Sequence, residues 1–554
     1  MKKAIVLGLI ALLVELTNNV VFGQNYSGGN GSQTNPYLIS SKADMETLAT
    51  AVNNGNDYAG KYFLLTQDLI GENDSISSMI GEYTYEEVHE GIYEVISNPF
   101  KGTFDGNNHE IALDISIPPI TLAQGVSDYD TYNNVGLFAY TLNATIKNLG
   151  VSGYIYSGSY DIDSPLKGKC FVGCIVGKGN GNDIPTNSTI INCYNKANVL
   201  IDGYGAGWWS SFGGIAGEGC TITKSYNEGN ITSYHSKSSV SLGGIGGGVD
   251  ATQCFNTGNV LLMGSTSTEA GTTGSPQYAG GIVGFATNGV SDCYNTGDVT
   301  VNVVATGQIQ ALAGGIAGSG HELFNHCYNT GTIKAKGETN VPSFCNAGGI
   351  IGEHYYEGKS SNNFSVGDVL CDLNIGTAKA YKIGYLVSGY TGQTIYIENN
   401  YASNSSVVQI NGETVDATIE NKKTGFNGEP TDLVNFKNKE WLSNTLDFDF
   451  NNIWTIENDD FPIFQFHEEF NPTNIESIKT IDIKVYPNPV NQYLYVNSDS
   501  SIKKIELYNS VGNLVLTETN FSGKIDVSKF NPGLYIIKVY AKNSNISKKI
   551  IIKE

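Results

Sequence analysis

The chain has 554 residues, with 66 Gly, 33 Tyr and only 4 Met, and a formal net charge of −22. Many Gly and Tyr with few Met indicate a turn-rich β protein rather than a helical one. The negative charge is spread along the chain, which argues against binding to nucleic acid or to an anionic membrane surface.

The first 23 residues have the pattern of a secretory signal peptide. Lys2 and Lys3 precede an apolar run at residues 4–14 that is too short to cross a bilayer, and the small residue Gly23 stands before Gln24. We expect residues 1–23 to be removed and the mature chain to be exported. We expect no transmembrane segment in the rest of the chain.

Residues 25–134 are predicted to form an N-terminal cap and the first strands. Ser41 is a candidate N-cap of a short helix, with Asp44 three residues later and an apolar stripe at helical spacing. A strand at Tyr62–Leu65 follows, and residues 100–111 have the pattern of a strand, an Asp-Gly turn and a second strand. The first coil of a repeat array has an open end that must be covered, and a single helix ahead of the array is expected to form this cap.

Residues 135–410 repeat a motif in two parts, Gly-Gly-Ile-x-Gly and, after a variable stretch, Cys-Tyr-Asn-x-Gly-x-Val. The clear copies are 30, 37, 34 and 34 residues apart and start at Gly213, Gly243, Gly280, Gly314 and Gly348. This period predicts a solenoid in which each unit buries its apolar face against its neighbours. Alternating residues such as Val299, Val301 and Val303 indicate strands, stacked about 4.8 Å apart. The paired glycines are expected to allow sharp bends and close backbone approach.

Nine cysteines in an exported protein suggest disulfides, but the repeat indicates another role. One slot of the motif holds Cys193, Ser225, Cys254, Cys293 and Cys327. A slot that accepts Cys or Ser is expected to hold a small buried side chain stacked between coils, next to a corner residue in solvent. The odd total excludes complete pairing within one chain, although neighbouring coils would bring cysteines close together.

The residue after this slot is aromatic in seven copies, which are Tyr194, Tyr226, Phe255, Tyr294, Tyr328, Phe364 and Tyr401. The rings would form a ladder with one ring per coil. If the strand continues straight past the inward Cys, the rings face outward and offer a platform for sugar rings. If the chain turns, they close the core as a stacked row, which is favoured because two are Phe. Tyr294 and Tyr328 are kept as candidate ligand-binding residues.

Trp208 and Trp209 are the other candidate ligand-binding residues. They lie in a loop rich in Gly and Ser, residues 203–211, within the longest gap between Gly-containing units. Inserted loops are where solenoids commonly carry function. The pair either forms an exposed recognition patch, or one of its rings caps the core beside the solenoid.

Two groups of residues resemble catalytic sites without meeting the required geometry. His321 and His326 nearly match a zinc-protease motif, but they stand five residues apart on an expected strand, whereas the motif needs a spacing of four on a helix. Loop carboxylates and lysines gather before the clear repeats, at Asp128, Asp130, Asp161, Asp163, Lys167 and Lys169. The sequence does not indicate their convergence on one groove, so we expect solvated loop charges, no metal and no cofactor.

The two-part motif resembles the GLUG-type repeats of bacterial surface proteins, over about residues 25–466. That resemblance implies a right-handed parallel β-solenoid. It implies little about activity, because such repeats occur in adhesins and beside IgA1-cleaving zinc peptidases. Residues 411–470, with Trp454 and Phe461, are predicted to form the C-terminal cap of the solenoid.

A second resemblance covers residues 481–554, after a predicted linker at residues 471–480. The motifs Val-Tyr-Pro-Asn-Pro (485–489), Pro-Gly-Leu-Tyr-Ile (532–536) and Lys-Lys-Ile-Ile-Ile-Lys (548–553) together resemble a type IX secretion sorting domain of Bacteroidota. Short strands with Gly and Pro turns also indicate a small β-sandwich. The resemblance implies passage through the type IX machinery, removal by a sortase-like protease, and attachment to surface lipopolysaccharide or release.

The sequence therefore predicts an all-β protein, with a capped right-handed parallel β-solenoid followed by a small Ig-like β-sandwich. We expect an adhesin-like scaffold outside the cell that binds a glycan or a protein and has no catalytic centre. The main alternative is a polysaccharide lyase or glycoside hydrolase that uses the carboxylates between Asp128 and Asp163. A purely structural role in a surface layer is a third possibility.

Overall fold

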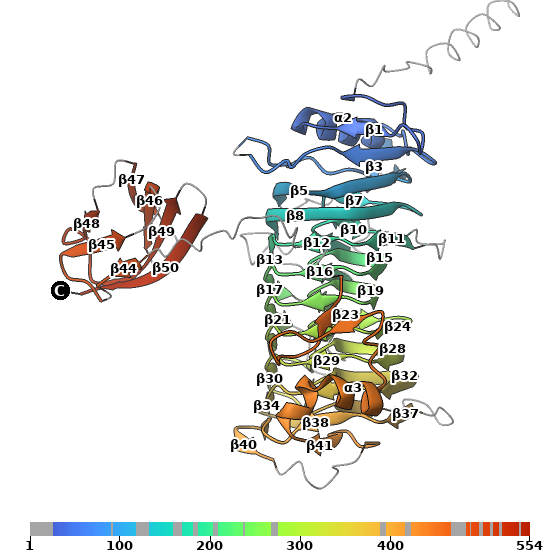
Figure 1. The fold of residues 1–554 in the computed structure, drawn as a ribbon, viewed down its shortest axis with the longest axis vertical. Helices are drawn as coiled ribbons and strands as arrows, with labels where there is room; N and C mark the ends of the chain where they lie inside the picture. Colours follow the sequence, from blue (N-terminus) through green and yellow to red (C-terminus); the bar gives the residue numbers. More distant parts are fainter. Residues whose placement is uncertain are drawn as a thin grey trace, which may run out of the picture. The chain divides into compact units, whose positions relative to one another are not determined.

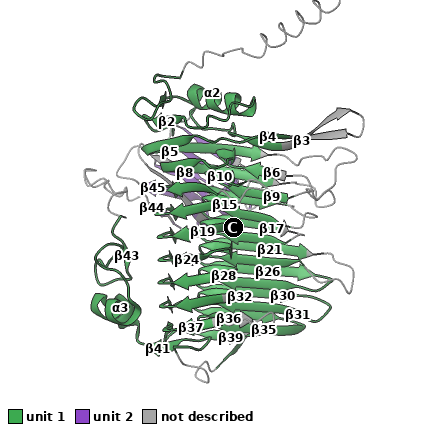
Figure 2. Ribbon diagram, turned by 90° about the vertical axis from the view of Figure 1, so that its right-hand side faces the viewer, with its two compact units in different colours: residues 1–467 green, residues 468–554 purple. Residues whose placement is uncertain are grey.

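The computed structural model describes residues 26–71, 73–89, 92–117, 132–158, 169–180, 187–202, 209–236, 239–266, 275–387, 395–415, 423–466, 484–487, 489–497, 502–509, 514–519, 523–541 and 544–553. The chain divides into two compact units, residues 1–467 and 468–554 (Figure 2). The predicted signal peptide, Trp208, the four loop aspartates and the predicted linker lie outside the described residues.

The predicted helix lies ahead of the first coils (Figure 1). α2 (Lys42–Asn53) begins after Ser41, whose hydroxyl oxygen accepts a hydrogen bond from the backbone N–H of Asp44. Parallel strands β1 (Tyr37–Ile39) and β2 (Tyr62–Leu65) flank it in the sequence. The helix prediction is confirmed. An antiparallel hairpin follows, formed by β3 (Glu82–His89) and β4 (Ile92–Asn98).

The Asp-Gly turn predicted within residues 100–111 is wrong. β5 (Thr103–Ile117) runs through this region as one strand and pairs in parallel with β8 (Thr145–Gly158). Asn107 and Asn108 have left-handed φ angles of 51° and 63°, at the point where the register shifts. The extra residues therefore form a bulge, and the chain does not reverse.

Each coil passes through four strand positions. The coils stack one on the next (Figure 1). The first position forms an eight-stranded parallel sheet of β6 (Tyr132–Val135), β9 (Lys169–Gly173), β14 (Ser210–Gly213), β18 (Val240–Gly243), β22 (Pro276–Gly280), β27 (Gln310–Gly314), β31 (Ser343–Gly348) and β35 (Gly376–Tyr381). The second position, after the Gly-Gly-Ile turn, contains β7 (Phe138–Tyr140), β10 (Val176–Lys178), β15 (Ala216–Thr223), β19 (Gly246–Thr252), β23 (Val283–Ala286), β28 (Ala317–Asn325), β32 (Ile351–Ser361) and β36 (Gly384–Val387). In three coils a further strand completes it, namely β11 (Ser188–Ile191), β24 (Gly289–Ser291) and β37 (Ile395–Glu398).

The remaining two positions follow a corner. The third is short and contains β12 (Tyr194–Asn195), β16 (Tyr226–Asn227), β20 (Phe255–Asn256), β25 (Tyr294–Asn295), β29 (Tyr328–Asn329), β33 (Phe364–Ser365) and β38 (Tyr401–Ser403). The fourth contains the end of β8 and then β13 (Asn198–Asp202), β17 (Ile231–Ser236), β21 (Val260–Thr266), β26 (Val299–Ala305), β30 (Ile333–Glu338), β34 (Val369–Leu373) and β39 (Val408–Ile410).

The repeat period sets the register of this stack. In the first strand position, Phe212 pairs with Leu242, which pairs with Ala279, and the row continues through Ala313 to Ala347. These partners stand 30, 37, 34 and 34 residues apart, the same offsets as the motif. The parallel β-solenoid predicted from the repeat is confirmed.

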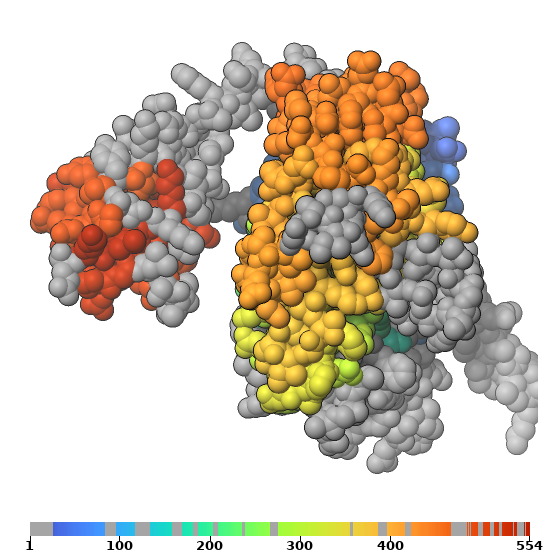
Figure 3. All heavy atoms as spheres, turned by 90° about the horizontal axis from the view of Figure 1, so that it is seen from below, coloured from blue at the N-terminus to red at the C-terminus, as the bar shows by residue number. Residues whose placement is uncertain are grey.

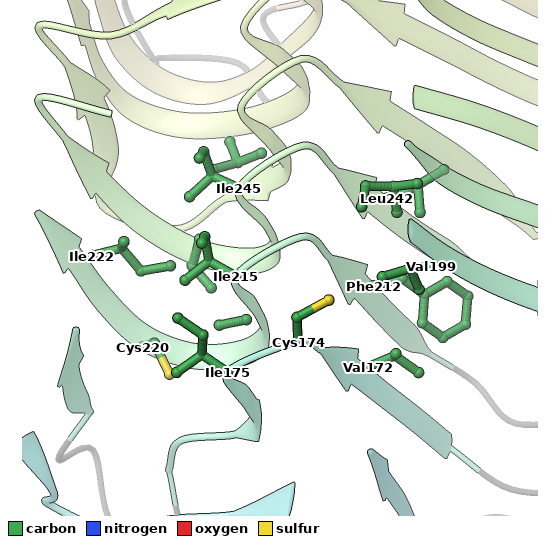
Figure 4. Close-up of a cluster of buried hydrophobic side chains, with 14 of the residues drawn as sticks. Val172, Cys174, Ile175, Val199, Phe212, Ile215, Cys220, Ile222, Leu242 and Ile245 are labelled. Carbon is green, nitrogen blue, oxygen red and sulfur yellow. The ribbon is translucent and has the colours of Figure 1, made fainter. Parts of the chain in front are cut away.

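The core lies inside the coils and continues along the stack (Figure 4). Two of its rows are Ile175, Ile215 and Ile245, from successive turns, and Val172, Phe212 and Leu242, from the first strand position. All six side chains are fully buried. Burial of such a side chain contributes about 1.5–3 kcal/mol, so each added coil stabilises its neighbours.

The cysteine slot is confirmed as a buried stack. All nine cysteines have free thiols and are buried, and the backbone N–H of Cys254 donates to Cys293 Sγ at 3.3 Å. The corner residue before the slot has a left-handed φ, for example 50° at Asp292 and 52° at His326. The side chains of these two corner residues are only 16% and 20% exposed, so the expectation that the corner lies in solvent is wrong for them.

The asparagine that follows the aromatic residue forms a second buried ladder. Its members, Asn195, Asn227, Asn256, Asn295 and Asn329, are all fully buried. Each Nδ2 donates a hydrogen bond to the backbone carbonyl two residues later, at 2.7–2.9 Å. In the first four asparagines it also donates to Oδ1 of the asparagine in the next coil, at 2.7–2.8 Å. Because these amides find partners inside the protein, their burial does not leave unpaired polar atoms.

The two halves of the motif touch at this ladder. A Cβ added to Gly214 would collide with Asn227, and one added to Gly244 would collide with Asn256. The second glycine of each turn therefore makes room for the asparagine in the same coil, which explains why the two halves of the motif occur together.

Residues 413–415 and 423–466 follow the last full coil in the chain. β40 (Glu413–Thr414) and β41 (Glu429–Thr431) pair with the last coil. The chain then runs back along the side of the coils as residues 432–466, which we call the strap (Figures 1 and 3). The strap contains η2 (Leu433–Lys437), α3 (Lys439–Leu446), β42 (Trp454–Thr455) and β43 (Ile463–Phe464). The segment predicted as an end cap therefore also covers a side of the solenoid.

The second unit is the predicted small sandwich. One antiparallel sheet contains β44 (Lys484–Tyr486), β45 (Tyr493–Asn497) and β48 (Lys524–Asp526). The other contains β47 (Leu514–Glu518), β46 (Ile502–Asn509), β49 (Gly533–Ala541) and β50 (Ser544–Ile552). Buried residues from both sheets, such as Leu494 and Ile537, form its core. Among the described residues of the whole chain, no helix is long and apolar enough to span a membrane.

The asparagine ladder generates a stability prediction. Asn256→Ala removes the donor to Asn295 and to the Gly258 carbonyl and the acceptor for Asn227. Each buried group left without a partner costs roughly 1–3 kcal/mol, so the free energy of unfolding in urea should fall clearly. The control is Asn451→Ala at an exposed position, which should have little effect. Equal stability of the two variants would contradict a structural role for the ladder.

Candidate ligand-binding site

Two rows of variable side chains face each other on the outside of the Gly-Gly-Ile turn. The first row stands two residues before the turn and consists of Phe171, Ser211, Ser241, Tyr278, Leu312 and Asn346. Each residue of the second row stands seven residues after the first-row residue of the same coil. The second row consists of Lys178, Glu218, Gly248, Phe285, Ser319 and Glu353. Coil stacking keeps each row in line, because neighbouring members are partners in the strand register.

In most coils the two rows close against each other. The Lys178 ammonium lies 4.5 Å from the Phe171 ring centre, and Ser211 Oγ donates to Glu218 Oε2 at 3.0 Å. Two coils further on, the Tyr278 and Phe285 rings are 5.7 Å apart. In a later coil Asn346 Nδ2 donates to Glu353 Oε2 at 3.3 Å.

One coil leaves the double row open, because Ser241 and Gly248 are too small to close it. Trp209, from the coil before, spans this opening, with its ring 5.8 Å from Tyr278 and 5.5 Å from Phe285 in the coil after. A cleft of about 470 Å³ remains beside it. A Cβ on Gly248 would make only ordinary contacts, at 3.4 Å, so the missing side chain is not required by the backbone.

Four consecutive coils line this cleft, which we call the Trp209 cleft. Its residues are, coil by coil, Asn180 and Asn187; Trp209, Glu218 and Gly219; Gly248, Val249 and Asp250; and Phe285, Thr287 and Asn288. Aromatic faces thus lie beside amides and carboxylates, the mixture that ligand sites use to combine apolar contact with orientation.

The polar side chains of the cleft are held in place. Asp250 accepts hydrogen bonds from the backbone N–H of Asn288 at 3.1 Å and from its Nδ2 at 2.8 Å. The Trp209 indole N–H donates to Ser211 Oγ at 2.8 Å. Asn180 Oδ1 is a buried acceptor that has no hydrogen-bond partner among the described residues.

The electrostatic setting of Glu218 differs from that of an exposed carboxylate. Burial raises the pKa of Glu218 above its usual range, although the charges of Lys178 and Lys169 oppose the shift. Burial also lowers the pKa of Lys178. Within the part of the chain that the structure describes, the lining of the cleft includes two carboxylates, Glu218 and Asp250, and no Lys, Arg or His.

Of the four residues predicted to bind a ligand, Trp209 lies at this cleft and Trp208 lies outside the described residues. Tyr294 and Tyr328 belong to the aromatic ladder, whose rings stack from Tyr194 to Phe364 at 4.7–5.2 Å. They face away from the core that holds Cys293 and Cys327, as the straight-strand alternative required.

The strap covers these rings, however. Trp454 lies 6.1 Å from both Tyr294 and Tyr328, Phe464 lies 5.3 Å from Tyr294, and the Tyr328 hydroxyl donates to the Pro462 carbonyl at 2.6 Å. Only 4% of Tyr294 and 1% of Tyr328 is exposed. The strap thus occupies the face that a sugar platform at these two residues would need.

Sequence reasoning missed Glu218, Asp250 and Phe285. A usable signal was present, since the glycine-rich stretch at residues 243–248 ends in Gly248, where the other five copies carry a side chain. Recognising it required the knowledge that positions seven residues apart face each other across the turn.

The two histidines of the rejected zinc motif face different neighbours. The His321 ring lies 5.2 Å from Phe285, whereas His326 Nδ1 lies 3.6 Å from Asp292. Within the described part of the chain, no group of three or more His, Cys, Asp or Glu side chains is placed to hold a metal ion.

Comparison with known families agrees with these two architectures. The sequence profile of the secretion system C-terminal sorting domain matches residues 484–553, and that of the GLUG motif matches residues 275–300. The chain carries GLUG repeats and a type IX secretion sorting domain. This sorting domain directs the GLUG-repeat protein to the cell surface or the extracellular space.

No curated protein matches this chain in sequence. One solved structure, of a candidate immunoglobulin A1 protease from Bacteroides ovatus, is 18% identical, with a TM-score of 0.33. The match covers 80% of this chain and 95% of the other.

The strap generates one prediction. Tyr294→Ala removes a ring that stacks on Phe255 and Tyr328 and contacts Trp454, so the free energy of unfolding should fall by roughly 3–5 kcal/mol. The measurement is urea unfolding, combined with binding assays on the folded variant. Loss of ligand binding without loss of stability would restore Tyr294 as a binding residue.

Asp292 generates a pH prediction. Burial raises the pKa of its carboxyl to about 6, and the charge of Asp449 adds to the shift. The folded state thus holds a proton that the unfolded state has lost, so this residue lowers stability as pH rises from about 4 to 6. Asp292→Asn should increase the free energy of unfolding at pH 7, by up to about 3 kcal/mol, and the gain should vanish near pH 4.

Asp105→Asn is a control of opposite sign. Despite burial, hydrogen bonds from Asn148 and Asn107 and the neighbouring Lys147 hold the pKa of Asp105 below its usual value. This substitution should therefore lower stability at pH 7. A stability difference for Asp292→Asn that does not change between pH 4 and pH 7 would contradict the assignment.

Proposed function

We propose that this exported GLUG-repeat protein is an adhesin-like scaffold that binds a glycan in the Trp209 cleft without catalysis. The observation that carries the proposal is the cleft at the open coil of Ser241 and Gly248, where Gly248 lacks a side chain and Trp209 lines the space. Surface display follows from the sorting domain, whereas the ligand and the lack of turnover are inferred from the cleft.

The chemistry of the cleft suits a sugar. The C–H faces of a pyranose pack on aromatic rings, which Trp209 and Phe285 offer. Sugar hydroxyls donate and accept hydrogen bonds at once, and Asn side chains do the same, whereas carboxylates accept. Asn180, Asn288 and Asp250 supply these groups.

The scaffold supports binding by holding these groups before the ligand arrives. Glu218 is on β15, Phe285 is on β23, and Asp250 is fixed by Asn288. A site built on strands loses little conformational freedom when a ligand binds.

The lack of turnover is argued from the same carboxylates. A glycoside hydrolase needs one carboxyl that donates a proton and one that activates water or attacks the sugar. Asp250 is engaged by Asn288, and Glu218 by Ser211. The alternative enzyme, which uses the carboxylates between Asp128 and Asp163, depends on residues outside the described part of the chain.

The proposal includes a route to the surface. The second unit would engage the type IX secretion machinery and then be removed by a sortase-like protease. The solenoid would afterwards be attached to surface lipopolysaccharide or released, with the cleft available to extracellular glycans.

A glycan array with the full chain tests this function. Gly248→Leu should fill the cleft and Trp209→Ala should remove its aromatic face, so each should weaken binding at least tenfold, about 1.4 kcal/mol. Glu353→Leu, at the same row position three coils away, is the matched control and should bind normally. Melting temperatures would show that all three variants fold.

Two results would contradict the proposal. One is undiminished binding by Gly248→Leu and Trp209→Ala. The other is release of reducing ends or unsaturated products from any glycan, which would favour the hydrolase or lyase.

A further inference from the structure

We infer that the Trp209 cleft takes a neutral oligosaccharide of at least three sugar units, aligned with the solenoid axis, and rejects uronate-containing or sulfated glycans. This inference rests on the proposed function and deepens it by naming the ligand class. It combines the direction of the cleft with the charge of its lining.

The direction follows from the lining residues, which come from four consecutive coils in order. Asn180 belongs to the first coil, Glu218 to the second, Asp250 to the third and Asn288 to the fourth. Stacked strands lie about 4.8 Å apart, so the cleft extends over about 14 Å along the stack. A coil spacing is close to the length of one pyranose unit, so successive sugars would meet successive coils.

Each coil also supplies polar groups for one sugar. Asn180 Oδ1, a buried acceptor without a partner among the described residues, would take a ligand hydroxyl or amide hydrogen at one end. Asp250 and Asn288 are already hydrogen-bonded to each other. At the other end of the cleft, their remaining donor and acceptor atoms would bond to the hydroxyl groups of the last sugar. Trp209 lines the middle of this path and would contact the central sugar.

The charge of the lining determines which sugars are accepted. Glu218 and Asp250 line the cleft, and none of the described lining residues is a Lys, Arg or His. Lys178 is next to Glu218 in the second row, but its ammonium lies over the Phe171 ring and it does not line the cleft. A uronate or sulfate would therefore be desolvated next to two carboxylates, with no cation among the described lining residues, which is unfavourable.

A neutral sugar faces no such penalty. Its hydroxyl groups donate to the same two carboxylates, and hydrogen bonds to a charged acceptor are stronger than those to a neutral one. The net charge of −22 over the chain further disfavours polyanionic glycans in solution.

Calorimetry on the full chain tests length and charge separately. The neutral probes are β-1,4-linked glucose, mannose and N-acetylglucosamine oligomers of one to six units, and the acidic probes are mannuronate and galacturonate oligomers of equal lengths. For a neutral series that binds, affinity should rise at least tenfold from one to three units and then level off. Acidic oligomers of equal length should bind at least tenfold more weakly.

Variants identify the carboxylates as the source of discrimination. Glu218→Gln and Asp250→Asn, alone and combined, should narrow the ratio of neutral to uronate affinity at least fivefold. Glu353→Gln is the matched control. The Glu353 carboxylate lies in the second row, outside the cleft, and accepts a hydrogen bond from Asn346. It should leave the ratio unchanged, and thermal unfolding would confirm that each variant is folded.

The outcomes separate this inference from the function on which it rests. Uronates that bind as well as neutral sugars, or affinity that does not grow beyond one unit, would overturn the inference while glycan binding stands. A ratio unchanged in the Glu218→Gln and Asp250→Asn double variant would also overturn the charge argument. Absence of binding to every probe would overturn both.

Discussion

The solenoid depends on one constraint, that each residue must stack on its equivalent in the neighbouring coil. Backbone hydrogen bonds between parallel strands enforce this register, and the buried asparagine ladder repeats it with side chains. The ladder fits only because the second glycine of each turn has no side chain, as at Gly214 and Gly244. Stacking between coils therefore explains most residues of the repeated motif without any further function.

The same constraint indicates where function can arise. Residues that face the core or a ladder must match their neighbours, whereas the two rows outside the turn vary from coil to coil. A single small pair in those rows, Ser241 and Gly248, opens a cleft that the neighbouring Trp209 and Phe285 bound. A binding site can thus form on a rigid scaffold by removal of side chains, without any change in the path of the backbone.

Local and periodic features could be predicted from the sequence, and long-range packing could not. The spacing of the motif gave the coil offsets, Ser41 marked the start of α2, and the Ser-tolerant slot marked the buried cysteine stack. The strap has no period, and its contacts join residues far apart in the chain, such as Tyr328 and Pro462. The sequence therefore predicted an outward-facing aromatic ladder as one alternative, but it did not predict that the strap covers the ladder. For the same reason Glu218, Asp250 and Phe285 were not recognised as neighbours.

The proposed ligand lies in the Trp209 cleft and not on the aromatic ladder or another face. Hydroxyl-radical footprinting of the full chain, with and without the neutral oligosaccharide that binds most tightly, tests it most directly. Binding in the cleft should protect Trp209 and Phe285, with no change at Phe344 and Tyr396, which are 47% and 57% exposed. Protection confined to Phe344 or Tyr396, with Trp209 oxidised as in the free protein, would contradict it.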